Sequence, residues 1–424
     1  MTVAVLQTLI NNAGSSSFAG DGTSGIYIWG AQLEQSATVG EYIPTTSAIN
    51  SAPRFDHNPT TGESLGLLVE EQRTNLLLRS EEFDNASWIK SALLAFGSGS
   101  TANAIAGPSG AVSADLLTED TATTEHFAEQ NFNTISGTTY AFSVFVKAGA
   151  NKTTVVLRLT TAAWSGGANN QVRFNLSTGA STIIVGSPVA FSQNFGNGWW
   201  RFTIVSTASS TGTPAARIHL TDSSGNTSYT GDGTSGIYLW GADLQAGAFP
   251  TSYIPTTTAA ATRNADVASI TGTNFSSWYR QDEGTVYAEA LTQEYTVTTF
   301  PRVFSIDDGG AASSFIALVR GSNTRRWDYS VFANGTGQAV GLNNGISPSA
   351  GAVCRGAVIY RANDFTGATQ GVLMNADTSG SVPTVNALGI GMQSNATLQF
   401  NGHIRRLVFW RQALPGQLQA ITQP

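Results

Sequence analysis

Short runs in which apolar and polar residues alternate fill the middle of the chain, and this period of two is typical of strands with one buried face. Turn-forming Gly, Ser, Thr and Asn residues separate several of the runs. The clearest runs cover residues 140–147, 153–159, 171–176, 199–205 and 217–220. Short alternating strands at this spacing predict an antiparallel β-sandwich of two sheets.

A second series of strand-like runs fills the last third of the chain. It covers residues 285–290, 302–306, 315–319, 327–332, 357–360, 387–392 and 403–410. A stretch rich in small residues after Thr256 predicts a linker between the two series, and residues 414–421 predict one or two helical turns near the end. The pattern therefore predicts an all-β chain with two β-sandwiches in tandem.

One stretch of sequence occurs twice: GDGTSGIYIWGAQLE at 20–34 and GDGTSGIYLWGADLQ at 231–245, identical at all but three positions. Alternating residues of the first copy fall on one face of a strand, namely Tyr27, Trp29, Ala31 and Leu33. Both copies are followed by Tyr-Ile-Pro-Thr. Because proline cannot donate to a sheet ladder, each strand should leave its sheet there.

Residues 1–50 are therefore predicted to be a partial β module, the last strands of a jelly-roll repeat. Two strands with one apolar face are not stable alone. We expect this segment to anchor the chain by packing on the next module, by pairing with a neighbouring chain, or by completing a sheet in another protein.

The composition favours strands over helices and argues against several classes of partner. Only 12% of the 424 residues are charged while 41% are hydrophobic, and long solvated helices need more charge than this. A net charge of -7 with 21 Lys and Arg residues argues against nucleic acid as a partner. Cys354 is the only cysteine, so no internal disulfide is expected. No apolar run reaches the length of a membrane span, so no membrane insertion is expected.

Four segments resemble the carbohydrate-binding-module-like jelly rolls of tailed-bacteriophage tail-fibre and head-fibre proteins. They are NLLLRSEEFDNASW (75–88), YAFSVFVKAG (140–149), NGWWRFTIV (197–205) and SGIYLWGADLQ (235–245). PRFDHNPTTGESLGLLVEEQRTNLL (53–77) resembles the connector before such modules, and GTVYAEA (284–290) with FNGHIRRLVFWRQALPGQLQAIT (400–422) resembles a concanavalin A/laminin-G-like sandwich. The resemblance implies a connector at 51–74, a jelly roll at 75–256 and a laminin-G-like sandwich at 257–424.

The same resemblance implies a non-enzymatic surface protein of a phage virion, a fibre or spike component assembled in the cytoplasm of the bacterial host. Its partners would be host-surface polysaccharide, other virion proteins contacted by the N-terminal segment, and further copies of itself, with a homotrimer favoured by the family. Two alternatives stay open. One is a capsid- or tail-decorating structural protein without a glycan ligand, and the other is a glycan depolymerase.

Sugar-binding proteins stack flat aromatic rings on the C–H faces of pyranoses, beside polar side chains. Trp164 lies in the polar, Gly-rich segment AAWSGGANNQ with Asn169 and Asn170 nearby, and Trp327 follows Arg325 by two positions. We expect these five residues to bind carbohydrate. The alternatives are that each tryptophan caps the edge of a core or belongs to an interface between chains.

No catalytic residue, metal ion or cofactor is expected. GESLG at 62–66 has the letters of a nucleophile elbow around Ser64, but a turn precedes it and a strand-like run follows where the elbow needs a helix. The four histidines are far apart in sequence. Adjacent carboxylates occur, but neighbours on a strand point to opposite faces, so they form no acid–base pair by themselves.

A structural calcium ion is often held in carbohydrate-binding jelly rolls by an acidic residue near the last strand. Here the matching position holds Trp240 or Gly241, and Asp243 is shifted along the strand, so the sequence predicts no calcium ion there. Asp21 and Asp232 of the two GDGT turns could bind a cation, yet Gly-Asp-Gly is ordinary turn chemistry.

Overall fold

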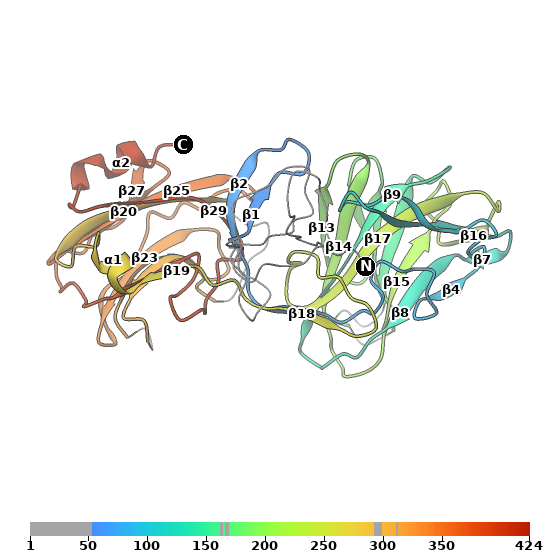
Figure 1. The fold of residues 1–424 in the computed structure, drawn as a ribbon, viewed down its shortest axis with the longest axis horizontal. Coiled ribbons are helices and arrows are strands. Elements are labelled where there is room, and N and C mark those ends of the chain that lie inside the picture. Colours follow the sequence, from blue (N-terminus) through green and yellow to red (C-terminus); the bar gives the residue numbers. More distant parts are fainter. Residues whose placement is uncertain (1–52, 162–163, 166–168, 292–298, 311–312) are drawn as a thin grey trace, which may run out of the picture. The chain divides into compact units, whose positions relative to one another are not determined.

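The computed structural model describes residues 53–161, 164–165, 169–291, 299–310 and 313–424. The chain divides into two compact units, Met1–Arg54 and Phe55–Pro424, and the described strands belong to the second. The partial β module predicted at 1–50 lies outside the described residues. Antiparallel strands make up the second unit (Figure 1), which confirms the all-β prediction.

The first sandwich consists of two six-stranded antiparallel sheets. The β10 sheet contains, in order, β12 (Ser181–Val185), β11 (Asn170–Asn175), β10 (Thr154–Leu159), β15 (Ala215–Leu220), β8 (Phe127–Asn131) and β4 (Ile89–Ser91). The β9 sheet contains β13 (Val189–Asn194), β14 (Trp199–Thr207), β9 (Thr139–Ala148), β17 (Gly236–Ala246), β6 (Val112–Thr118) and β5 (Thr101–Ala106). Alternate side chains of both sheets meet in one core, among them Phe142, Leu157, Phe202 and Ile218.

The strand β17 carries the second copy of the repeated sequence and lies between β9 and β6. Four of its side chains enter the core: Ile237, Leu239, Ala242 and Leu244. Between Trp240 and Asp243, three steps along β17 match two steps along β9, which is a β-bulge. Gly241 takes a φ of +59° at this bulge, and a Cβ there would lie 3.0 Å from the Phe145 ring.

The segment after β17 leaves the sheet, as Pro255 predicts, and covers the outer face of the β9 sheet. The Tyr253 ring lies 4.7 Å from the Trp240 ring, measured between centroids. The Thr251 carbonyl accepts a 2.6 Å hydrogen bond from Arg201 Nη1. Phe145 and Trp240 on that face are buried, with Tyr253 packed against them.

The second sandwich pairs a seven-stranded sheet with a six-stranded sheet. The β20 sheet contains β1 (Phe55–His57), β2 (Ser64–Val69), β29 (Gly402–Trp410), β20 (Glu283–Leu291), β25 (Val353–Arg361), β26 (Asp364–Thr369) and β27 (Val372–Leu373). The β21 sheet contains β19 (Ser269–Thr271), β28 (Ala387–Ile390), β21 (Arg302–Asp307), β22 (Phe315–Arg320), β23 (Trp327–Ala333) and β24 (Thr336–Leu342). Their core includes Val286, Phe304, Leu318, Tyr329 and Val358.

Residues 51–74, expected to be a connector, instead supply strands to the second sandwich. Leu67 and Val69 of β2 pair with Ile404 and Gly402 of β29, so the polypeptide enters this sandwich before it builds the first one. Gly66 permits the approach, because its φ is +95° and a Cβ would lie 2.4 Å from the Ile404 carbonyl oxygen. The sequence pattern missed this long-range pairing.

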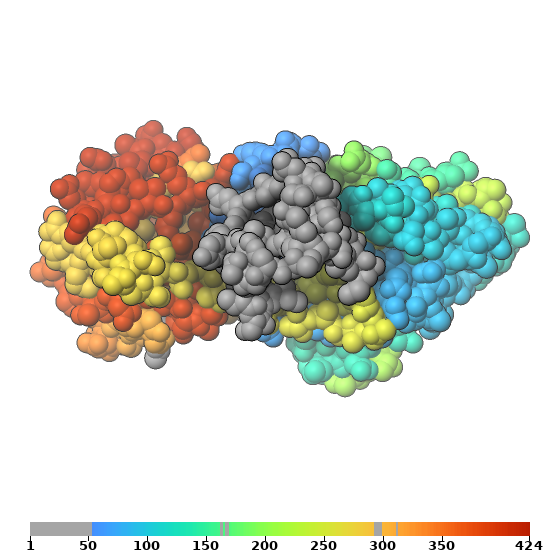
Figure 2. All heavy atoms as spheres, viewed as in Figure 1, coloured from blue at the N-terminus to red at the C-terminus, as the bar shows by residue number. Residues whose placement is uncertain are grey.

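Two short ribbons and three short helical segments complete the described residues. The ribbons are β7 (Thr123–Glu125) with β16 (Ser228–Thr230), and β3 (Arg73–Asn75) with β18 (Ala261–Arg263). The helical segments are α1 (Gly272–Ser276), a 3₁₀ turn (Pro415–Gln417) and α2 (Leu418–Ile421). In Figure 2 the yellow surface around α1 adjoins the red surface of the C-terminal residues. No helix in the described ranges is long and apolar enough to cross a bilayer.

Candidate functional site

The predicted sugar-stacking tryptophan of the first sandwich is a core residue. Trp164 is 0% exposed, and its ring lies 6.1 Å from each of the Phe132 and Tyr140 rings. Its Nε1 donates a 3.0 Å hydrogen bond to the Thr160 carbonyl. No face of the indole is open to a sugar, so the stacking role expected of Trp164 is wrong. Burial of so large an aromatic side chain stabilises the core of the first sandwich.

The two asparagines expected to bind sugar beside Trp164 make hydrogen bonds within the protein instead. Asn169 Oδ1 accepts a 2.6 Å hydrogen bond from the Thr161 amide, and the buried Asn170 side chain donates to Ser206 Oγ. Both amides therefore stabilise the ends of this loop.

The tryptophan expected to bind sugar in the second sandwich is buried as well. Trp327 is 1% exposed, and a Cβ placed on Gly356 would lie 2.7 Å from its ring. Because the Trp327 ring is buried, none of its faces is open to a sugar, and the stacking role expected of Trp327 is wrong. Arg325 is half-buried, and its backbone amide donates a 3.2 Å hydrogen bond to Ser347 Oγ.

A hollow beside α1, which we call the α1 pocket, gathers polar side chains from three separate stretches of the second sandwich. Its volume is about 760 Å³. The polar lining residues are Thr271, Thr273, Ser276, Gln281, Asn386 and Ser394, and the aromatic ones are Phe275 and Tyr279. All of these side chains are uncharged hydroxyl, amide or ring groups. No motif in the sequence marks them.

One buried carboxyl group fixes the edge of the α1 pocket. Asp307 ends β21 and is 1% exposed. It accepts hydrogen bonds from the Ser394 amide at 3.1 Å, from Ser394 Oγ, and from the Gly309 amide at 3.0 Å. Its carbonyl accepts a 2.9 Å hydrogen bond from the Asn386 amide. Asp307 therefore positions the two loops that carry Ser394 and Asn386.

Two aromatic rings also line the α1 pocket. The Phe275 and Tyr279 rings stack with 4.6 Å between their centroids. Burial raises the pKa of the Tyr279 hydroxyl above its usual value, so the group stays protonated and neutral. Gln281 is held beside the rings, because its Nε2 donates to the Pro383 carbonyl at 2.5 Å. Phe275 is 2% exposed and Tyr279 9%, and Tyr279 also stacks 5.9 Å from the Tyr360 ring, so the pocket combines neutral hydrogen-bonding groups with buried aromatic carbon.

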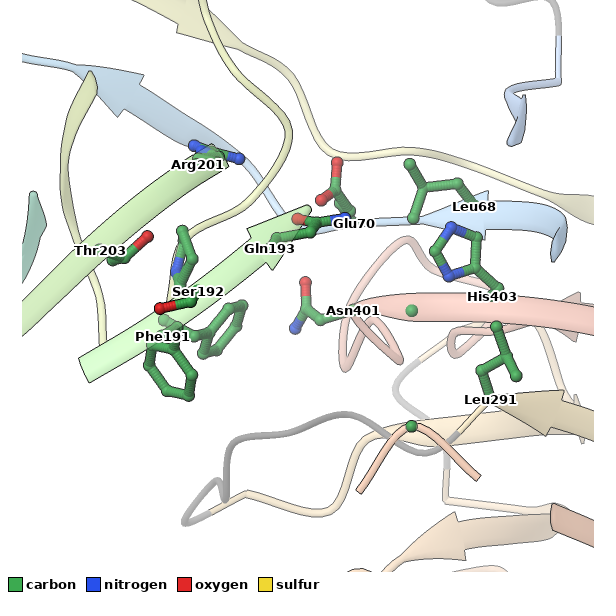
Figure 3. A pocket seen from close by; sticks show the side chains of 14 residues that line it. Leu68, Glu70, Phe191, Ser192, Gln193, Arg201, Thr203, Leu291, Asn401 and His403 are labelled. Carbon is green, nitrogen blue, oxygen red and sulfur yellow. The ribbon is translucent and has the colours of Figure 1, made fainter. Parts of the chain in front are cut away.

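A second, smaller hollow of about 310 Å³ lies beside β13, and Figure 3 shows the side chains around it. Its charged groups already have partners. Arg201 donates to Ser143 Oγ, to the Thr251 carbonyl and to Asp243. Glu70 accepts from the Ser252 amide at 2.8 Å, and His403 Nε2 lies 2.8 Å from Asp56 Oδ2. These charges stabilise the segments that form the hollow, so the α1 pocket is the stronger candidate.

The acidic residues discussed for cation binding have other roles. Asp243 Oδ2 lies 3.2 Å from Arg201 Nη2, so a guanidinium faces the carboxyl group. Burial raises the pKa of Asp243 to about 7, although Arg201 acts in the opposite direction. Asp232 accepts hydrogen bonds from the amides of Thr234 and Ser235, both at 2.7 Å, which is the turn chemistry of a Gly-Asp-Gly sequence. Among the described residues, no cluster of His, Cys, Asp or Glu could hold a metal ion.

The nucleophile-elbow geometry is missing around Ser64. This serine begins β2, and the strand continues to Val69, so a turn and a strand surround it as the sequence predicts. Its position therefore gives no support to an esterase site.

His219 on β15 is a buried histidine. Its side chain is 0% exposed, and neither ring nitrogen is bonded within the described part of the chain. Burial, together with the charges of Arg158 and Arg217, holds its pKa well below the usual value. The imidazole is therefore neutral in the folded protein at neutral pH.

Acidification should destabilise the first sandwich through His219. The unfolded state binds a proton below a pKa of about 6.5 and the folded state does not, so His219 stabilises the fold above that pH and the contribution is lost as pH falls. Between pH 7 and pH 5 the expected loss is about 2 kcal/mol. Urea unfolding of the wild type and of His219→Leu at both pH values measures it.

The experiment compares the loss of unfolding free energy between pH 7 and pH 5 in the wild type and in His219→Leu. The difference between these two losses is the contribution of His219. Burial raises the pKa of Asp115 to about 6 and that of Asp243 to about 7, and these carboxyl groups favour the fold as pH falls. Their contribution is common to both proteins and cancels in the difference. Equal pH dependence in wild type and His219→Leu would contradict the neutral, buried imidazole.

Comparisons with known proteins give remote structural similarity. No protein-family model and no curated protein sequence matches the chain. The CBM40 module of the Ruminococcus gnavus IT-sialidase is similar at 15% identity over 34% of this chain and 83% of the module, with a TM-score of 0.28. Mouse laminin α1 domains LG4–5 are similar at 10% identity over 90% of this chain and 96% of that one, with a TM-score of 0.25.

Two further solved structures belong to the same group of remote likenesses. A heptameric SAP-like pentraxin from Limulus polyphemus is similar at 11% identity over 33% of this chain and 70% of that one, with a TM-score of 0.27. The CBM40 module has also been solved with α2,6-sialyllactose bound. At these identities and scores, the fold of this chain rests on its own strands and their pairing, and its function on its own pockets.

Proposed function

We propose that this protein is a non-enzymatic glycan-binding protein and that the α1 pocket takes the sugar. The observation that carries the proposal is the lining of that pocket, which combines uncharged hydroxyl and amide side chains with the buried rings of Phe275 and Tyr279. A sugar presents hydroxyl groups and apolar C–H faces on the same ring. The neutral hydroxyl and amide groups of the pocket match the sugar hydroxyls, and the buried rings contribute apolar carbon beside them but no open stacking face.

The lining favours a neutral sugar over an acidic one. No lysine or arginine is among the described residues that line the pocket, and Asp307 lies directly behind Ser394. A carboxylate or sulfate on the ligand would lose its hydration without gaining a cation as partner. We therefore propose a neutral, pyranose-containing glycan as the ligand.

On this proposal the chain is a fibre or spike component on the surface of a tailed-bacteriophage virion and contacts polysaccharide of the host. The resemblance of the segments 75–88 and 235–245 to the jelly rolls of tailed-phage fibre proteins supports this placement. A single open pocket binds sugar weakly, and several copies side by side raise the overall affinity. A homo-oligomer, in the favoured form a trimer, would supply those copies.

An Asn386→Ala substitution tests the proposed pocket. The purified protein is expected to bind neutral glycans on an array, and Asn386→Ala should weaken that binding about fivefold to tenfold because one hydrogen bond is lost. Thr384→Ala is the matched control, since Thr384 is exposed two residues away and does not line the pocket. Titration of the best glycan by calorimetry gives the affinities of all three proteins.

Other outcomes of the same array decide between the alternatives. Binding that Asn386→Ala leaves unchanged, or binding to acidic glycans alone, would contradict the α1 pocket. A protein that binds no host polysaccharide would favour the structural, capsid- or tail-decorating role. Release of reducing ends from host capsule or lipopolysaccharide would indicate a depolymerase.

A further inference from the structure

We propose that the turn at residues 83–88 is a binding site for a cation of ammonium size, and that the side chain of Lys90 occupies this site as a tethered ion. Lys90 Nζ donates hydrogen bonds to four backbone carbonyl oxygens, which we call the carbonyl cage. They belong to Phe83 at 2.9 Å, Asp84 at 3.3 Å, Asn85 at 2.9 Å and Trp88 at 2.9 Å. The α1 pocket lies in the second sandwich, so the proposed glycan binding does not involve this site.

The number of acceptors indicates that Lys90 is charged. A neutral amine has two N–H donors and a lone pair that carbonyl oxygens repel, whereas an ammonium group has three donors and no lone pair. Only the ammonium form can therefore serve four nearby oxygens, with one proton shared. Burial lowers the pKa of Lys90, while the negative charges of Asp84 and Asp115 act in the opposite direction.

Backbone hydrogen bonds fold the turn so that its carbonyls converge. The Asn85 amide donates to the Glu82 carbonyl, and the Trp88 amide donates to the Asn85 carbonyl, both at 3.1 Å. Asn85 Oδ1 accepts a 3.0 Å hydrogen bond from the Ser87 amide. These bonds occupy amide groups of the turn, while its carbonyl oxygens face Lys90. The carbonyl cage is thus built by the turn itself.

The carbonyl cage is attached to the core of the first sandwich at both ends. Phe83 and Trp88 are fully buried, with 4.7 Å between their ring centroids. Asp115 on β6 accepts a 2.8 Å hydrogen bond from the Phe83 amide. Without a cation, the carbonyl dipoles of the cage would face one another without compensation beside this core. A cation in the cage should therefore stabilise the whole sandwich.

The geometry of the carbonyl cage selects the kind of cation. Three of its four distances to Lys90 Nζ are 2.9 Å, which suits an ammonium group. Calcium binds oxygen at about 2.3–2.6 Å and is usually held by carboxylates as well as carbonyls. Potassium resembles ammonium in size and charge, and carbonyl oxygens alone can replace its hydration shell. With the lysine removed, the cage is expected to take ammonium or potassium ions.

Chemical rescue of Lys90→Ala tests the carbonyl cage. Without added cation the variant is expected to unfold at a lower urea concentration than the wild type, because the carbonyls have lost their donor. If the free ion binds with a dissociation constant of about 10 mM, about 100 mM ammonium or potassium chloride lowers the equilibrium constant of unfolding about tenfold. Choline chloride at the same concentration matches the ionic strength with a cation too large for the cage.

The chain contains only three lysines, and one of them gives a matched control. Lys147 is half-buried on β9 of the same sandwich, so Lys147→Ala removes the same side chain away from the carbonyl cage. Wild type and Lys147→Ala should each unfold at the same urea concentration in ammonium, potassium and choline chloride. Near-ultraviolet circular dichroism follows the unfolding of all three proteins.

A measurement on the wild type serves if Lys90→Ala does not fold. In ¹⁵N-labelled protein the ammonium protons of Lys90, assigned through its Cε, should exchange with water more slowly than those of Lys147. Exchange at equal rates would overturn the proposal. A folded Lys90→Ala with the same stability in ammonium, potassium and choline chloride would overturn it too. Rescue by calcium alone would also contradict it, because carboxylates rather than the carbonyl cage would then hold the ion.

Discussion

Replacing Trp164 by alanine is expected to lower the free energy of unfolding of the first sandwich by about 3–5 kcal/mol. The indole is fully buried between the two sheets, where it contacts Phe132 and Tyr140, and its Nε1 bonds to the Thr160 carbonyl. Alanine would leave a cavity that close-packed neighbours fill only in part. Urea unfolding at constant temperature, followed by near-ultraviolet circular dichroism, measures the change.

Binding measurements on the same variant separate a structural tryptophan from a sugar-binding one. Where Trp164→Ala is still folded, its affinity for glycans should equal that of the wild type. Trp327→Ala is the matched control, because its loss of stability should appear in the unfolding of the second sandwich. A Trp164→Ala protein of wild-type stability that no longer binds glycan would restore the hypothesis drawn from the sequence.

The strands and the two sandwiches could be predicted because their signal is local. Runs such as 140–147 and 199–205 alternate with a period of two, and they became parts of β9 and β14. The exit from the sheet at Pro255 was predictable as well, since proline lacks the amide that a ladder needs. Such features depend on residues that are neighbours in sequence.

The sugar site could not be predicted in the same way. AAWSGGANNQ has the composition of an exposed loop, yet Trp164 turns inward because a core position was open to it. The α1 pocket gathers Thr273, Asn386 and Ser394, which are about 120 residues apart at the extremes and form no motif. The pairing of β2 with β29 likewise joins residues that are far apart along the chain. The burial of Trp164, the lining of the α1 pocket and the pairing of β2 with β29 all depend on contacts between residues far apart in the sequence.

The repeated GDGT turn has a structural role in the first sandwich, and a buried ion pair holds it. Glu119 follows β6, and its Oε1 accepts a 3.1 Å hydrogen bond from the Asp232 amide in the turn. Lys152 Nζ bonds to Glu119 Oε2 and donates to the Thr221 carbonyl at 2.8 Å and to Tyr229 Oη at 2.9 Å. Both charged side chains are almost fully buried.

The hydroxyl of Tyr229 completes this network. It donates to Glu119 Oε2, while burial and the bond to Glu119 raise the pKa of Tyr229 above its usual value. The phenol therefore stays protonated and remains a donor. The carboxyl group of Glu119 thus accepts from a lysine, a tyrosine and a backbone amide at once, which ties the GDGT turn to the end of β6.

Removing one charge of the Lys152–Glu119 ion pair is expected to lower the free energy of unfolding more than removing both charges. Lys152→Met leaves the buried carboxylate of Glu119 without its cation and should lower the free energy of unfolding by about 3–5 kcal/mol. Lys152→Met/Glu119→Gln removes both charges, and a glutamine oxygen can still accept from Asp232 and Tyr229, so the double variant should lose clearly less. Urea unfolding of the wild type, both single variants and the double variant gives the interaction energy of the pair. Additive losses would contradict a stabilising interaction between Lys152 and Glu119, because they would mean that the two buried groups do not depend on each other for stability.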